Sequence, residues 1–128
     1  KPDNKILLRC FSYIERMNLA YAACDLVLSR AGAISIAEIT AVGVPSILVP
    51  YPHASGGHQE KNARHLESQR AAEVILDSDL NGSTLYEAIS RLVYDEEKLS
   101  EMRKKALLAG KPKAAEELAE LVEELFVS

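Results

Sequence analysis

Short, almost continuously apolar runs alternate along this chain with longer segments of helical periodicity. Runs of this kind are typical of strands buried on both faces, as in a parallel sheet covered by helices. The alternation therefore predicts an α/β domain, with a parallel sheet of about four strands flanked by helices. The expected strands occupy residues 5–11, 25–29, 46–51 and 71–76, the last with the weakest pattern.

Helical patterns fill the segments between and after these strands, and local chemistry supports several of their ends. Gly43 and then Pro45 are expected to end the second helix. Asn81 or Ser83 is expected to cap the fourth helix. The expected helices span residues 15–24, 35–43, 58–70, 81–95, 96–110 and 113–126.

The segment from about residue 96 to the end at residue 128 is predicted to form two helices with a break at 110–112, where Gly and Pro occur. In the second of these helices, apolar residues recur at the spacing of one buried stripe. We find neither an internal repeat nor a low-complexity linker, so residues 1–128 are assigned to one domain. The predicted stripe consists of Leu118, Leu121, Val122, Leu125 and Phe126.

Bulk composition argues against several classes of function. The net charge is −4, with basic residues scattered among acids, and aromatic residues make up only 5%, so no nucleic-acid partner is expected. Neither a membrane-spanning run nor a signal peptide is visible. Cys10 and Cys24 follow no metal-binding spacing and are expected to be buried, reduced thiols in a cytoplasmic protein.

A turn of small residues connects the run at 25–29 to the next helix. Gly32 has no Cβ to keep a ligand away from the backbone, and Ala31 and Ala33 are small. A helix start exposes unpaired N–H groups and the positive end of the helix dipole, so this turn suits a phosphate, with Ser35 adding a hydroxyl. Alone, the pattern is weak, because many α/β proteins use such a turn only for packing.

Two charged residues near this turn have two interpretations each. Glu38 either completes a capping box with Ser35 or accepts hydrogen bonds from paired ribose hydroxyls, and local evidence favours the cap. Arg30, directly after the strand, either pairs with a phosphate or forms a salt bridge with a neighbouring acid. The residues themselves leave Arg30 undecided.

A second informative segment is a Gly-Gly turn followed by a helix that carries His58, Gln59 and Asn62 on its first turns. The two amides offer neutral donors and acceptors for sugar hydroxyls. The alternative is that His58 caps the helix while the amides face solvent. His53 and His58 have no acidic or Cys ligand near them in the sequence, so no metal site is expected.

Together, these segments resemble the donor-sugar domain of the MurG family, the bacterial UDP-N-acetylglucosamine–lipid I transferases of peptidoglycan synthesis. The resemblance is strong from about residue 11 to 63 and looser afterwards, and the eukaryotic dolichol-linked GlcNAc transferase catalytic subunit is a more distant relative. It rests on D-L-V-x-S-R-A-G-A-x-x-x-x-E at 25–38, G-x-P-S-I-L-V-P-Y-P at 43–52 and H-Q-x-x-N-A at 58–63.

The resemblance implies a GT-B architecture of two Rossmann-like domains, of which this chain would be an incomplete C-terminal, donor-binding domain. It implies that the backbone near Ile14 meets the uracil and that Glu38 holds the ribose hydroxyls. It also implies that the helix start at 33–35 meets the diphosphate, and that no metal or cofactor is needed. With the turn residues included, the candidate donor-binding residues are Ile14, Arg30, Gly32, Ala33, Ile34, Ser35, Glu38, His58, Gln59 and Asn62.

The family enzymes are far longer than 128 residues, and no residue here is assigned a catalytic role. We therefore expect weak UDP-GlcNAc binding by part of a metal-independent hexosyltransferase that converts lipid I to lipid II. No turnover is expected from this chain alone. The alternatives are an engineered or structural α/β fragment without activity, and one subunit of a split transferase.

In the family fold, further strands separate the first two strands found here. Buried-type strands with an open edge tend to pair, so we expect either a rearranged four-stranded sheet or self-association. The acceptor domain or a partner chain is the expected partner. The family is peripheral on the cytoplasmic face of the inner membrane, and a cytoplasmic location is expected here.

Overall fold

A parallel three-stranded sheet forms the centre of the computed structural model, which describes residues 17–53 and 57–127. The strands are β1 (Val27–Ser29), β2 (Ser46–Leu48) and β3 (Ala72–Val74), in the order β1-β2-β3. Three of the four predicted strands are thus confirmed, and the expected strand at 5–11 lies outside the described residues. Helices flank this sheet, as the alternating pattern predicts.

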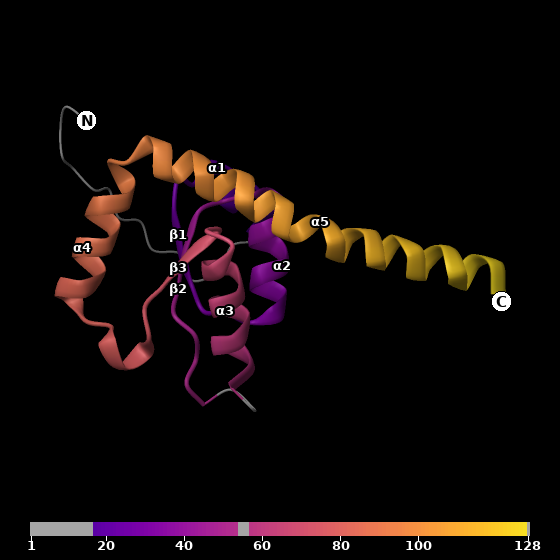
Figure 1. Ribbon diagram of the computed structural model, residues 1–128, viewed down its shortest axis with the longest axis horizontal. Helices are drawn as coiled ribbons and strands as arrows, with labels where there is room; N and C mark the ends of the chain where they lie inside the picture. Colours follow the sequence, from indigo (N-terminus) through magenta and orange to yellow (C-terminus); the bar gives the residue numbers. More distant parts are fainter. Residues whose placement is uncertain (1–16, 54–56, 128) are drawn as a thin grey trace.

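The helices lie on both sides of the sheet (Figure 1). Neighbouring residues of β2 point to opposite faces, and each face has its own core. Leu48 packs with Ile39 and Leu66 of the α2 and α3 side, whereas Ile47 packs with Leu92 and Met102 of the α4 and α5 side. The elements are α1 (Met17–Ala23), α2 (Ala33–Val42), α3 (His58–Ser68), the 3₁₀ turn η2 (Asp77–Asp79), α4 (Gly82–Val93) and α5 (Glu96–Val127).

Two predicted helix ends are confirmed. Gly43 ends α2 in the left-handed region at φ 78°, and its N–H donates to the Ile39 carbonyl. Asn81 caps α4 through a capping box with Thr84. These ends are set by residues adjacent in the sequence, which explains why local chemistry predicted them.

The predicted helix break at 110–112 is wrong, because α5 runs without interruption from Glu96 to Val127. Gly110 serves close packing instead: a Cβ there would lie 3.2 Å from the Cβ and the carbonyl oxygen of Thr40 in α2. An interior proline removes one backbone donor and tends to kink or break a helix, yet α5 continues through this position. Gly110 therefore lets two helices approach each other, and it does not mark a boundary.

The predicted buried stripe is also wrong where it can be checked. Leu121, Val122 and Leu125 are exposed by 53%, 42% and 70%, because this end of α5 projects beyond the rest of the domain (Figure 1). The side chains of Leu118 and Phe126 lie outside the described part of the structure.

Cys24 is a free thiol, but it is exposed and not buried as expected. It lies in the turn between α1 and β1, where its N–H donates to the Tyr21 carbonyl and its side chain leaves the core. Cys10 lies outside the described residues. Within the described ranges, each helix is too short or too polar to cross a membrane.

Candidate functional site

The turn between β1 and α2 leaves the start of α2 open. Gly32 precedes the helix at φ −69° and ψ 156°, and no side chain caps this end. The Gly32 carbonyl accepts the first helical bond, from Ile36. The N–H groups of residues 33–35 find no acceptor among the residues that the structure describes. Such a start, with its partial positive charge, suits an anionic ligand.

The capping box predicted for Ser35 and Glu38 is wrong. Because α2 begins at Ala33, Ser35 is already inside the first helical turn and cannot be the residue before the helix. Across the described ranges, the Glu38 carboxylate makes no hydrogen bond or ion pair. Burial, and then the charge of Glu38, raises the pKa of Tyr21. Glu38 is thus half-buried near Tyr21, with its hydrogen-bonding capacity unused.

Gln59 joins the two segments that the sequence singled out. Its Oε1 accepts the N–H of Ala31 at 3.2 Å and the N–H of Tyr51 at 2.8 Å. Asn62, on the next turn of α3, donates from Nδ2 to the Ala31 carbonyl at 3.4 Å. These amides therefore hold the β1–α2 turn against the start of α3, and they are not merely solvated.

The start of α3 is also open. Gly57 precedes the helix in the left-handed region at φ 68°, and no side chain of the described residues caps it. His58 is the first helical residue and is exposed, so the interpretation of His58 as the cap is wrong. Since Gln59 uses Oε1 on the backbone, its Nε2 remains as the donor; this atom lies 3.7 Å from where a Cβ on Gly32 would be.

Arg30 forms the salt bridge that was one of its two interpretations. Its Nη1 lies 2.7 Å from Asp77 Oδ1 and donates to the Val49 carbonyl at 3.4 Å. Its guanidinium lies 5.5 Å from the ring centre of Tyr51, which in turn meets His53 edge to face. Arg30 therefore links the segments that follow all three strands.

Sequence reasoning missed Asp77 and Tyr51. Both come shortly after a strand, and the carboxyl ends of parallel strands share one edge of the sheet, so their positions were a usable signal. The structure gathers most candidates at this edge, from residues 30–35 and from the start of α3. Ile14 lies outside the described residues. In the described part of the chain, no three His, Cys, Asp or Glu side chains gather as a metal site would require.

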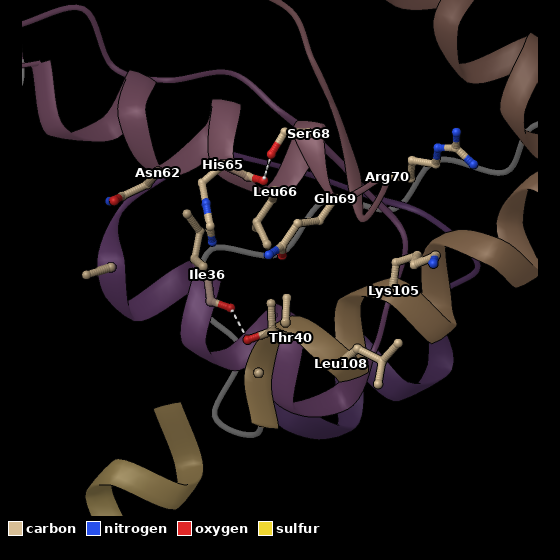
Figure 2. Close-up of a pocket in the computed structure, with 13 residues that line it drawn as sticks. Ile36, Thr40, Asn62, His65, Leu66, Ser68, Gln69, Arg70, Lys105 and Leu108 are labelled. Carbon is tan, nitrogen blue, oxygen red and sulfur yellow. Dashed lines mark hydrogen bonds between the residues drawn. The ribbon is translucent and has the colours of Figure 1, made fainter. Parts of the chain in front are cut away.

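A separate groove of about 800 Å³ lies between α2, α3 and α5. Figure 2 shows Ile36 and Thr40 of α2 facing Leu66 of α3 and Leu108 of α5 across it. Among the candidate residues only Ala33 and Asn62 line this groove; Glu38 and Gln59 do not. The groove therefore adjoins the open start of α2 at Ala33, while Glu38 and Gln59 lie outside it.

Comparisons with known proteins identify similar sequences over most of the chain. Residues 2–118 match the family model described as glycosyltransferase family 28 C-terminal domain. The chain is 46% identical over 123 residues to a curated protein of Halothermothrix orenii named UDP-N-acetylglucosamine--N-acetylmuramyl-(pentapeptide) pyrophosphoryl-undecaprenol N-acetylglucosamine transferase. That match covers 96% of this chain and 33% of the relative, so the chain spans about a third of its length.

Solved structures give the same picture. The structure of Acinetobacter baumannii MurG matches with a TM-score of 0.77 and 31% identity, over 89% of this chain and 34% of that protein. The glycosyltransferase VinC, solved in complex with dTDP, matches with a TM-score of 0.71 and 20% identity, over 90% of this chain and 28% of that one. The second match supports the fold alone.

Proposed function

Because the chain belongs to the family of glycosyltransferase family 28 C-terminal domains, we propose that it is the UDP-GlcNAc-binding part of a MurG-type transferase that converts lipid I to lipid II. The observation that carries the proposal is the open start of α2, held beside the start of α3 by Gln59. The similar curated proteins bear the name of this transferase, which supports the choice of donor and acceptor.

The diphosphate of the donor would bind the free N–H groups at 33–35, where Ser35 adds a hydroxyl. Hydrogen bonds and the helix dipole would there stabilise the charge of the leaving UDP without a metal. Gly32, which has no side chain, would let the phosphates approach the backbone, and Ile34 would line the site. Arg30, which directly follows β1 in the same turn, would add a positive charge.

The sugar groups would be held by side chains on either side of the diphosphate. Glu38 would accept hydrogen bonds from the ribose hydroxyls, since its carboxylate is unused by the described residues. His58, Gln59 and Asn62 would lie along the GlcNAc, with Gln59 donating from Nε2. The backbone near Ile14 would meet the uracil.

Transfer also requires the acceptor and a general base within hydrogen-bond reach of the reacting hydroxyl. The relatives are about three times as long, and we propose that the acceptor domain lies in the additional part of such an enzyme. A separate partner chain that carries this domain is the alternative. We therefore propose no turnover by these 128 residues alone. The complete enzyme would be peripheral on the cytoplasmic face of the inner membrane, like its family.

An amide NMR titration of the chain with UDP-GlcNAc tests the proposal directly. We expect a dissociation constant of about 1 mM, because micromolar binding would require roughly 4 kcal/mol more than one half-site provides. Amide shifts should concentrate at 32–38 and 58–62, while the amides of α4 stay unchanged. Uridine should bind more weakly than UDP if the diphosphate is held by the helix start.

The titration also has outcomes that count against the proposal. Equal affinities for uridine and UDP would mean that the start of α2 does not bind the diphosphate. No shifts at several millimolar UDP-GlcNAc would favour a structural domain without donor binding. Shifts that appear only after a partner chain is added would favour a split transferase.

A further inference from the structure

Tyr51 is an exposed residue whose ring is nevertheless held by its neighbours at the carboxyl edge of the sheet. The Arg30 guanidinium lies over the ring, 5.5 Å from its centre, and His53 meets the ring edge to face with the ring centres also 5.5 Å apart. The main-chain N–H of Tyr51 donates to Gln59 Oε1 at 2.8 Å. These contacts restrict the orientation of a side chain that is 45% exposed and lies outside the core.

Arg30 uses only one of its three nitrogens on the partners that surround it. Nη1 donates both to Asp77 Oδ1 at 2.7 Å and to the Val49 carbonyl at 3.4 Å. Nε and Nη2 have no acceptor among the residues that the structure describes. A guanidinium binds a phosphate well when two of its nitrogens donate in parallel. The Nε–Nη2 edge of Arg30 is therefore available for such a contact.

The hydrogen bonds of Arg30 do not by themselves fix the direction of this edge. Both are made by a single nitrogen, so the planar group can turn about it, and the side chain is 49% exposed. An aromatic face restricts this turn, because the guanidinium gains cation–π attraction only while it lies over the ring. The bonded Nη1 and the ring of Tyr51 together determine where Nε and Nη2 lie.

We propose that Tyr51 is a positioning residue of the donor site, whose ring holds Arg30 so that Nε and Nη2 meet a phosphate of the UDP donor. The inference rests on the proposed function and adds to it a residue that acts on the ligand through Arg30. Arg30 directly follows β1, and Gly32 precedes α2 in the same turn. The guanidinium and the free N–H groups at 33–35 therefore belong to one short segment, and both donate to the diphosphate.

Replacement of the ring separates this role from a role in packing. Tyr51→Leu removes the aromatic face but keeps the main-chain N–H, so the bond to Gln59 survives. It should weaken UDP binding about threefold in the amide NMR titration, which is the size of a cation–π contact at an exposed site. The affinity for uridine, which carries no phosphate, should not change. Tyr51→Phe restores the aromatic face and should restore the affinity for UDP.

A double-mutant cycle shows whether Tyr51 acts through Arg30. In Arg30→Gln the guanidinium is absent, so the further change Tyr51→Leu should leave the UDP affinity at the value of Arg30→Gln alone. The matched control is Tyr86→Leu, since Tyr86 of α4 is 66% exposed and makes no ring or cation contact within the described ranges. It should not change UDP binding in either background. Circular dichroism establishes that each variant is folded.

The Nε–H resonance of Arg30 reports the proposed contact directly. In the unaltered chain it should shift when UDP is added and stay in place when uridine is added. The shift on UDP should be smaller in Tyr51→Leu and return to full size in Tyr51→Phe. A role of Tyr51 in packing alone would not link this resonance to the aromatic face.

The outcomes distinguish failure of this inference from failure of the proposed function. A preference for UDP over uridine that is unchanged in Tyr51→Leu would overturn the inference and leave the proposed function standing. A threefold loss that persists in the Arg30→Gln background, or an equal loss for uridine, would show that the ring contacts the nucleotide itself and would also reject the positioning role. Equal affinities of the unaltered chain for UDP and uridine would contradict both.

Discussion

The helices of this domain begin in two different ways. α4 has a complete cap: Asn81 Oδ1 accepts the Thr84 N–H at 2.9 Å, and Thr84 Oγ1 accepts the Asn81 N–H at 3.0 Å. α2 and α3 begin at Gly32 and Gly57, and within residues 17–53 and 57–127 neither start has a side-chain cap. All three helices follow a strand of the same sheet, so their place in the fold does not explain the difference.

The contrast indicates what each start is for. A closed cap satisfies the orphan N–H groups with the chain's own atoms and stabilises the helix by about 1 kcal/mol. Glycine has no side chain that could cap the helix. The N–H groups at the helix start can therefore bind a ligand. The two open starts are also the two joined by Gln59, which supports a shared ligand for them.

Gln59→Ala should have the largest effect on stability. It removes the acceptor of two backbone N–H groups, and leaving these unsatisfied should lower the free energy of unfolding by about 2 kcal/mol. Chemical denaturation measures this change, and the NMR titration should show loss of UDP-GlcNAc binding as well. Gln69→Ala, on the exposed end of the same helix, is the matched control. A change below the error of the control would mean that the Gln59 bonds do not hold the two starts together.

Gly32→Asp should move stability and ligand binding in opposite directions. The backbone of Gly32 is in an ordinary region and a Cβ fits there, so the new carboxylate can cap α2 and add about 0.5 kcal/mol of stability. The same charge would repel the diphosphate, and UDP binding should fall at least about tenfold.

Gly82→Asp is the control for this substitution, because it adds the same charge at the capped start of α4, where space is open. It should leave UDP binding unchanged. Equal losses from both variants would attribute the effect to net charge and not to the start of α2.

Asn81→Ala should cost about 1 kcal/mol of stability, because the Thr84 N–H loses its acceptor, Asn81 Oδ1. Thermal unfolding measures the loss, and UDP binding should not change. Ser83→Ala, at the exposed neighbour that was the alternative cap, should do nothing. A fall in UDP binding on loss of the α4 cap would erase the distinction between closed and open starts.

Local signals explain what the sequence predicted well. The strands at β1, β2 and β3, the end of α2 at Gly43 and the cap of α4 at Asn81 all depend on residues a few positions apart. The same locality misled the interpretation of Ser35 and Glu38. Their spacing fits a capping box, but α2 begins at Ala33, and only the full structure sets that position.

Contacts between distant residues set the rest of the site. The acceptor on Gln59 is 28 residues from Ala31, and Asp77 is 47 residues from Arg30. The end of α5 shows the same limit. Periodicity predicts that Leu121 and Leu125 share a face of the helix, but it does not predict that this face is exposed. A pattern gives the direction of a side chain within its helix, and its neighbours come from the topology.

The smallest effects should come from two exposed ion pairs, and their comparison locates the ligand charge. Glu73 holds Arg91 through two bonds of 2.7 and 2.9 Å and raises its pKa, while Asp77 holds Arg30 at the sheet edge. Glu73→Gln and Asp77→Asn should each lower stability by only about 0.5 kcal/mol, because both ion pairs remain accessible to water.

Only Asp77→Asn should change UDP binding, and it should tighten it about threefold, because it removes a negative charge and releases Arg30 toward the diphosphate. The NMR titration compares the two variants under the same conditions. Weaker binding in Asp77→Asn would mean that Asp77 positions Arg30 for the ligand and does not compete for it. Identical binding in both variants would place Arg30 outside the site and leave the open start of α2 to hold the phosphates without it.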